Sequence, residues 1–221
     1  METIGQTPLP KPRLRGVSHQ WAFFFFFVAG AALVVAAPSG KATLAAAIYA
    51  VTVAGLFGTS AIYHRITWAT EGARRWMKRL DHTMIFFLIA GTYTPFALLV
   101  LDGTLATAIL VGVWAGALAG LVLNLVWIDS PKWVTAAVYV GLGWVAVIAL
   151  PDLASELGLG ALALVAGGGL LYTAGAVIYA LRRPDPVPAV FGYHEIFHVL
   201  VVAAAALHFA VIAFLVVPLA G

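Results

Sequence analysis

Long apolar stretches separated by short polar connections dominate the chain. A helix needs about 20 mostly apolar residues to cross a bilayer, and seven stretches come close to that length. They are 19–37, 42–63, 82–101, 104–128, 133–150, 157–181 and 192–217. The runs are continuous and do not alternate with polar residues, which disfavours transmembrane β-strands. The pattern predicts an all-α fold, a seven-helix membrane domain over residues 19–221 that follows a short tail over residues 1–18.

The first stretch also resembles the core of a signal peptide, because a basic segment from Lys11 to Arg15 precedes it. Its apolar run is longer than the roughly 7–15 residues of a signal-peptide core. We therefore expect it to be a retained span.

The composition narrows the possible functions. Apolar residues make up 63% of the 221 residues and charged residues only 10%, with a mean hydropathy of +1.02. This excludes a soluble enzyme and a disordered chain. Twelve basic and nine acidic residues give a net charge of +3, too small and too dispersed for a nucleic-acid partner. The chain has no cysteine, so any metal has to be held by His, Asp or Glu.

Lysine and arginine positions predict the orientation. Placing the N-terminus and the second, fourth and sixth connections on one side puts eleven of the twelve basic residues there, and only Lys41 on the other. Cytoplasmic connections carry the excess of Lys and Arg. We expect a multi-pass protein of the cell membrane, with its N-terminus cytoplasmic and its C-terminus outside.

Ionisable residues inside spans are costly and mark candidate functional sites. His64 ends the second span, Asp81 opens the third, and His194 and His198 open the seventh. With the predicted orientation, all four lie at the cytoplasmic end. His194 and His198 are four residues apart and share a helix face, as do Ser60 and His64. Three imidazoles suit Zn²⁺, and a carboxylate or water can complete the tetrahedron.

Each of these residues also has a structural interpretation. Glu195 completes a His-Glu-x-x-His motif and could act as a general base, although it lies off the face that carries both histidines. Asp81 could instead be a helix N-cap, and Ser60 could bond its own backbone. His19 and His82 are expected in the headgroup region. His208 lies roughly 15 Å beyond His198 along a helix, so we expect it to pack or hydrogen-bond rather than to bind the same ion.

Three motifs resemble the progestin and adipoQ receptor (PAQR) family, in particular its bacterial haemolysin III branch. They are Gly58 to His64, Leu80 to Phe96, and Gly192 to His198 with the following His208-Phe209. The resemblance covers nearly the whole chain and implies seven helices with a zinc ion near the cytoplasmic face. It also implies zinc ligands at His64, His194 and His198, a contact between Asp81 and the water on the metal, and a place for Ser60 beside the metal.

The resemblance and the residues together suggest a zinc-dependent hydrolase of a lipid amide, as in a ceramidase, or of a lipid ester. Asp81 would take a proton or aim the water, and Ser60 would orient the site or stabilise an oxyanion. The substrate would be a membrane lipid that enters from the inner leaflet. The alternative is a non-enzymatic membrane-homeostasis or sensing protein with structural zinc. A pore-forming haemolysin, as the branch name implies, fits less well because no charged stripe is present for an aqueous lumen.

Overall fold

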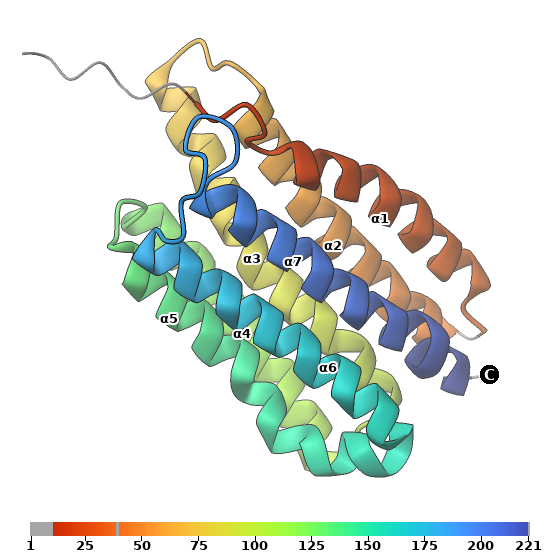
Figure 1. The fold of residues 1–221 in the computed structure, drawn as a ribbon. Coiled ribbons are helices and arrows are strands. Elements are labelled where there is room, and N and C mark those ends of the chain that lie inside the picture. Colours follow the sequence, from red (N-terminus) through yellow and green to blue (C-terminus); the bar gives the residue numbers. More distant parts are fainter. Residues whose placement is uncertain (1–10, 39, 221) are drawn as a thin grey trace, which may run out of the picture.

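Long helices lie side by side in a single bundle (Figure 1). The computed structural model describes residues 11–38 and 40–220, and none of these residues forms a β-strand. The helices are α1 (Val17–Ala36), α2 (Gly40–Arg65), α3 (Glu71–Leu99), α4 (Gly103–Val126), α5 (Lys132–Gly143), α6 (Leu150–Leu181) and α7 (Tyr193–Val211). A 3₁₀ segment, Trp144–Ala149, joins α5 to α6, and α7 continues as a π turn, Ile212–Val216, and a 3₁₀ turn, Val217–Ala220.

The expected helical membrane bundle is confirmed. Six helical segments among the described residues are long and apolar enough to cross a bilayer. One of them runs for 50 residues, Lys132–Leu181, and contains both stretches that the sequence predicts at 133–150 and 157–181. Residues 1–10 of the expected tail lie outside the described residues, and α1 begins at Val17.

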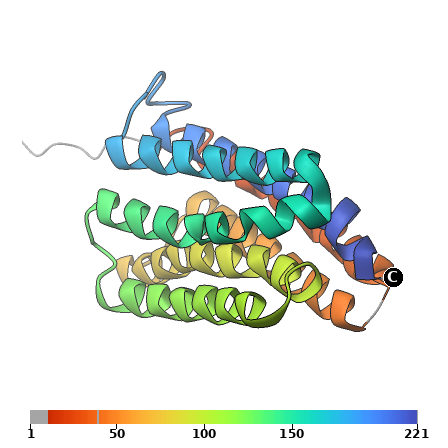
Figure 2. The ribbon, with the colours of Figure 1, turned by 90° about the horizontal axis from the view of Figure 1, so that it is seen from below.

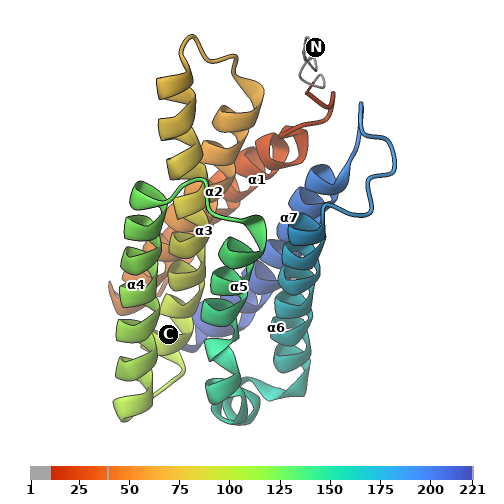
Figure 3. The ribbon, with the colours of Figure 1, turned by 90° about the vertical axis from the view of Figure 1, so that its left-hand side faces the viewer.

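The chain reverses direction between α5 and α6, which pack against each other (Figures 1 and 3). Gly158 adopts a φ of 78° and a ψ of 168° in this region, a conformation open to glycine and strained for other residues. Figure 2 shows α5 between α6 and α3. The reversal falls where Pro151 and Asp152 separate the predicted stretches 133–150 and 157–181.

Helix α7 occupies a central place in the bundle. It packs along α6 on one side and against α1 on the other (Figures 1 and 3). Helices α1 to α4 pack in chain order, α1 on α2, α2 on α3 and α3 on α4. Close approach of α2 and α3 depends on Gly91, since a Cβ there would overlap the side chain of Thr52. The first turn of α7 therefore lies next to the ends of helices that are distant in sequence.

Helix α3 begins eleven residues before the stretch expected at 82–101. Thr70 is its N-cap, and the Thr70 hydroxyl accepts a hydrogen bond from the N–H of Ala73 at 3.2 Å. Glu71 in the first turn favours the positive end of the helix dipole. The extra turns carry charged residues that a hydropathy window rejects. Asp81 therefore lies in the third turn of α3, and its interpretation as an N-cap is wrong.

The polar turns of α3 are tied to the connection between α4 and α5. Arg75 and Lys78 both contact the Asp129 carboxylate, at 2.7 and 3.0 Å. The hydrogen bond and the charge of Lys78, aided by Arg75, hold the pKa of Asp129 below its usual value. These exposed ion pairs contribute little to stability, but they join the first turns of α3 to the α4–α5 connection at the end of the bundle that carries the candidate site.

Candidate metal centre

Three histidines from two helices come together at this end of the bundle. His64 lies in the last turn of α2, and His194 and His198 lie in the first two turns of α7. One ligand-type nitrogen from each can be chosen so that all three lie within 4.8 Å of one another. The rings of His64 and His194 each lie about 5 Å from that of His198, at 5.0 and 4.6 Å. The structure thus brings together the three residues predicted as metal ligands.

The donor set fits a zinc ion. The Nε2 atoms of His64 and His194 are 3.3 Å apart, which is close to the edge, about 3.3 Å, of a tetrahedron with Zn–N distances near 2.0 Å. His198 is 2% exposed, and its Nδ1 has no hydrogen-bond partner among residues 11–38 and 40–220. Buried polar atoms without a partner call for an explanation, and a bound ion in this cluster supplies one.

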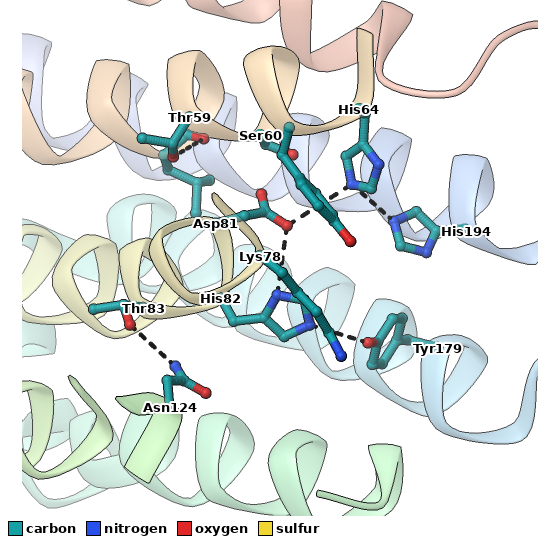
Figure 4. Close-up of polar contacts among 12 residues, drawn as sticks. Thr59, Ser60, His64, Lys78, Asp81, His82, Thr83, Asn124, Tyr179 and His194 are labelled. Carbon is teal, nitrogen blue, oxygen red and sulfur yellow. Dashed lines mark hydrogen bonds and ion pairs between the residues drawn. The ribbon is translucent and has the colours of Figure 1, made fainter. Parts of the chain in front are cut away.

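Asp81 lies beside the histidine cluster (Figure 4). Its Oδ2 atom is 3.8 Å from Nε2 of His64 and 3.5 Å from Nδ1 of His82. The Asp81 side chain is buried, so this carboxylate faces imidazole rings rather than water. At this distance the Asp81 carboxylate is too far from His64 for a direct hydrogen bond.

His82 also turns inward. Its Nε2 atom lies 3.5 Å from the hydroxyl of Tyr179 on α6, and its backbone carbonyl accepts a hydrogen bond from Tyr139 at 3.0 Å. Its expected place in the headgroup region is wrong, because α3 starts earlier and carries His82 into the interior of the bundle.

Ser60 and His19 form a second layer behind the cluster. Nδ1 of His19 is 2.8 Å from the Ser60 hydroxyl oxygen. The His19 ring stacks on the His198 ring with centroids 3.7 Å apart and an interplanar angle of 10°. Ser60 is therefore connected to the histidine cluster through His19.

The expected headgroup position of His19 is wrong. His19 lies on α1 and is 3% exposed. From there it contacts two site residues, Ser60 and His198. Sequence reasoning missed it because His19 lies near the start of an apolar stretch, where a histidine commonly faces the membrane surface. The nearby serine, Ser18, and the basic residues do not reveal which way the ring turns.

A partly buried ion pair holds the start of α7. The Arg15 guanidinium contacts one oxygen of the Glu195 carboxylate, and the other oxygen accepts a hydrogen bond from the N–H of Gly192 at 2.8 Å. Glu195 is 2% exposed. Both of its oxygens are therefore engaged away from the histidine cluster, and the general-base interpretation of Glu195 fails.

The segment before α1 covers the site from the same side. The N–H groups of Arg13 and Leu14 donate hydrogen bonds to the carbonyls of Ala189 and Val190, at 3.0 and 3.1 Å. Gly16 follows with a φ of 78°, and a Cβ there would lie 2.6 Å from the Cβ of His64. Only glycine allows the chain to turn this closely over a site histidine.

An apolar cavity of about 190 Å³ extends from the cluster into the bundle. His19, Ser60, Asp81 and His198 line one end. The lining continues along the bundle through aliphatic and aromatic residues of α3 to α7 as far as Leu101, Leu153 and Val165. An apolar cavity that ends in a few convergent polar groups is typical of a ligand-binding site.

His208 lines the same cavity away from the cluster. Its Nε2 atom is 3.1 Å from the carbonyl oxygen of Val165 on α6. His208 does not belong to the group of potential metal ligands found among the described residues. The hydrogen bond to Val165 agrees with the expectation that His208 packs or hydrogen-bonds.

Comparison with known proteins gives one family. Residues 8–209 match the family described as haemolysin-III related. A Hemolysin-3 homolog of Bacillus subtilis (strain 168) is 33% identical over 162 residues, 73% of this chain and 72% of the relative. Hemolysin-3 of Bacillus cereus is 29% identical over 183 residues, 83% and 80% of the two chains. Monocyte to macrophage differentiation factor of Homo sapiens is 28% identical over 165 residues, 73% and 66%.

The Arg15–Glu195 contact predicts a stability difference between two Glu→Gln variants. Glu195→Gln keeps an acceptor for Gly192 but leaves Arg15 without its charge partner, so we expect it to lower the free energy of unfolding by about 1–3 kcal/mol. Glu71→Gln is the control, since Glu71 pairs with Arg74 at 3.3 Å on the exposed surface. This substitution should change the free energy of unfolding by less than about 0.5 kcal/mol. Thermal unfolding in detergent measures both. Equal effects would contradict an anchoring role for Glu195.

Proposed function

The chain belongs to the haemolysin-III related family, and we propose that it is a zinc-dependent hydrolase of a lipid amide or ester, located in the plasma membrane. The observation that carries the proposal is the position of Asp81, His194 and His198 at the polar end of an apolar cavity, with His64 completing the histidine cluster beside them. Families of this breadth do not fix an activity, so the chemistry is argued from the site.

The proposal includes seven spans with the N-terminus in the cytoplasm. A straight helix of 50 residues would be about 75 Å long, more than twice the roughly 30 Å of a bilayer core. The reversal between α5 and α6 supports two crossings within Lys132–Leu181. All basic residues except Lys41 then lie on the cytoplasmic side with the histidine cluster.

His64, His194 and His198 would hold the zinc ion. When bound by three neutral imidazoles, zinc keeps a position for water, lowers the pKa of that water towards 7 and polarises a carbonyl. The stacking of His19 on His198 and the anchoring of α7 by Glu195 restrict the movement of the ligand rings. Such surrounding contacts normally orient metal ligands.

Asp81 is placed to accept a proton. Its Oδ2 atom lies next to His64 and His82, and it would take the proton of the water that attacks the carbonyl and pass it to the leaving amine or alkoxide. Ser60 would donate a hydrogen bond to the developing oxyanion. The Ser60 proton is available for this hydrogen bond when Nδ1 of His19 is protonated. In that state the His19 N–H donates a hydrogen bond to the Ser60 oxygen, and the serine O–H can point at the substrate.

The cavity favours a substrate with a long apolar chain. Beyond the polar end its lining is aliphatic and aromatic, with residues such as Leu88, Phe96 and Val201. The reacting carbonyl would lie at the histidine cluster and the chain would extend into the bundle. A lipid amide or ester from the inner leaflet has this form, since its carbonyl lies near the membrane surface.

A second function is supported by the way the site joins helices. His64 belongs to α2, Asp81 to α3, and both His194 and His198 to α7. A zinc ion at this site could therefore hold the three helices together in a protein that senses the membrane without catalysis. Chelation would then lower thermal stability strongly, and no lipid would be hydrolysed. The name Hemolysin-3 of the Bacillus cereus relative suggests a pore, but the apolar cavity does not favour an aqueous channel.

Replacing Asp81 tests the proposed hydrolysis. Asp81→Asn removes the proton acceptor and keeps the shape of the side chain, so turnover of ceramide or a lipid ester should fall by about 10²-fold or more while zinc content stays near that of the wild type. Asp152→Asn, at an exposed position in the first turn of α6, is the control and should leave turnover unchanged. Normal turnover by zinc-loaded Asp81→Asn would contradict the role of Asp81. No turnover by the wild type would favour the sensing function.

The absence of native cysteine allows a direct test of topology. Single cysteines replace Ser130 in the α4–α5 connection, Glu156 near the α5–α6 reversal, and Arg183 after α6. In intact cells a membrane-impermeant maleimide should label Glu156→Cys only, while all three should react after permeabilisation. Labelling of exactly one of the Ser130 and Arg183 positions in intact cells would show that Lys132–Leu181 crosses once, which contradicts seven spans.

A further inference from the structure

Three buried polar atoms deep in the bundle have no hydrogen-bond partner among the residues that the structure describes. They are Nδ1 of His208 on α7, the hydroxyl of Tyr172 on α6 and the hydroxyl of Tyr49 on α2. The rings of Tyr172 and His208 are 5.6 Å apart, and the ring of Tyr49 lies 6.1 Å from that of Phe209, the residue after His208. The three form one polar cluster, named here the deep cluster, inside the part of the protein that is otherwise apolar.

Other polar side chains along the cavity have partners. Tyr93 bonds the carbonyl of Gly143 and the N–H of Ala146, Tyr139 bonds the carbonyl of His82, and Thr173 bonds the carbonyl of Gly169. Across residues 11–38 and 40–220, the buried side-chain atoms without a partner fall into two groups. The first is His19, His82 and His198 at the candidate metal centre, and the second is the deep cluster. The first group surrounds a ligand-binding centre, and the second calls for a ligand of its own.

The chemistry of the deep cluster is defined by one hydrogen bond. Nε2 of His208 lies 3.1 Å from the carbonyl oxygen of Val165, and since a carbonyl only accepts, Nε2 carries the proton. In the neutral ring Nδ1 is then an acceptor. The ring of Tyr172 lies 5.6 Å from the His208 ring, and its hydroxyl can donate or accept. Together they complement a group that both donates and accepts one hydrogen bond, which is the property of a hydroxyl.

The position of the deep cluster links it to the metal centre. His208 and Tyr172 line the cavity whose other end holds Asp81 and His198. His208 follows His198 by ten residues, about 15 Å along α7. A single extended acyl chain with its carbonyl at the metal centre passes the deep cluster within its length.

We propose that His208 and Tyr172 form a subsite for a hydroxyl group carried part-way along the acyl chain of the lipid. The inference rests on the proposed function, because it requires an acyl chain in the cavity. A polar group deep in a membrane protein is costly unless it acts on a ligand or partner. An unsubstituted chain would leave both groups without a partner, whereas a mid-chain hydroxyl satisfies both, so the subsite selects hydroxylated lipids.

Binding of two matched fatty acids tests the subsite. Ricinoleic acid and oleic acid share chain length and double bond and differ by one mid-chain hydroxyl. Full-length purified protein in detergent is titrated with each, by displacement of a fluorescent fatty acid. With two added hydrogen bonds, the wild type should bind ricinoleate on the order of tenfold more tightly than oleate.

Two variants remove the subsite with small changes of shape. Tyr172→Phe deletes only the hydroxyl, and His208→Gln keeps an N–H that can reach Val165 while removing the Nδ1 acceptor. Each should bring the ratio of the two dissociation constants close to one and change oleate binding little. Tyr93→Phe is the control, because the Tyr93 hydroxyl lines the same cavity and already has partners, so the tenfold preference should persist.

The outcomes separate this inference from the proposed function. Equal binding of both acids by the wild type, or a preference that survives both variants, overturns the subsite and leaves a lipid-binding cavity. Failure of both acids to bind overturns the subsite together with the acyl-chain cavity on which the proposed function depends. A preference lost in both variants and kept in Tyr93→Phe supports the subsite.

Discussion

The meeting of His64, His194 and His198 inside an apolar bundle is the constraint on which the structure of this end depends. Imidazoles removed from water need partners, and here they have one another, Asp81 and a stacked ring from α1. Many other contacts at this end help to hold α2, α3 and α7 at the required separation. The capping of α3 by Thr70, the close turn at Gly16 and the bond between Glu195 and Gly192 all act in this way.

Charged residues at the same end join two segments that are distant in sequence. Arg15 reaches from the segment before α1 to Glu195 at the start of α7, and the two backbone bonds from Arg13 and Leu14 join the same segments. The N-terminal segment and the connection before α7 are thereby fixed over the site. A membrane protein gains little from apolar burial between helices, since lipid is as apolar as the core. Polar contacts such as these therefore do much to fix the positions of the helices relative to one another.

Much of the fold follows from the apolar pattern. Segment length and helical spacing can be read from a single sequence. They give the all-α class, the positions of the helices, and the location of His64, Asp81 and His194 at the same end of the bundle. The start of α3 was harder to predict, because a charged helical turn lies outside what hydropathy measures. The direction of a side chain depends on tertiary packing, which explains the incorrect expectations for His19 and His82.

Zinc content per chain tests the central claim most directly. Purified protein, measured by inductively coupled plasma mass spectrometry, should carry about one zinc ion, which should be lost in His64→Ala and in His198→Ala and retained in His208→Gln. Wild-type protein without zinc, or zinc that persists in His64→Ala, would contradict the account. In that case the 3.3 Å separation of the His64 and His194 nitrogens would be a hydrogen bond between two rings rather than one edge of a metal site.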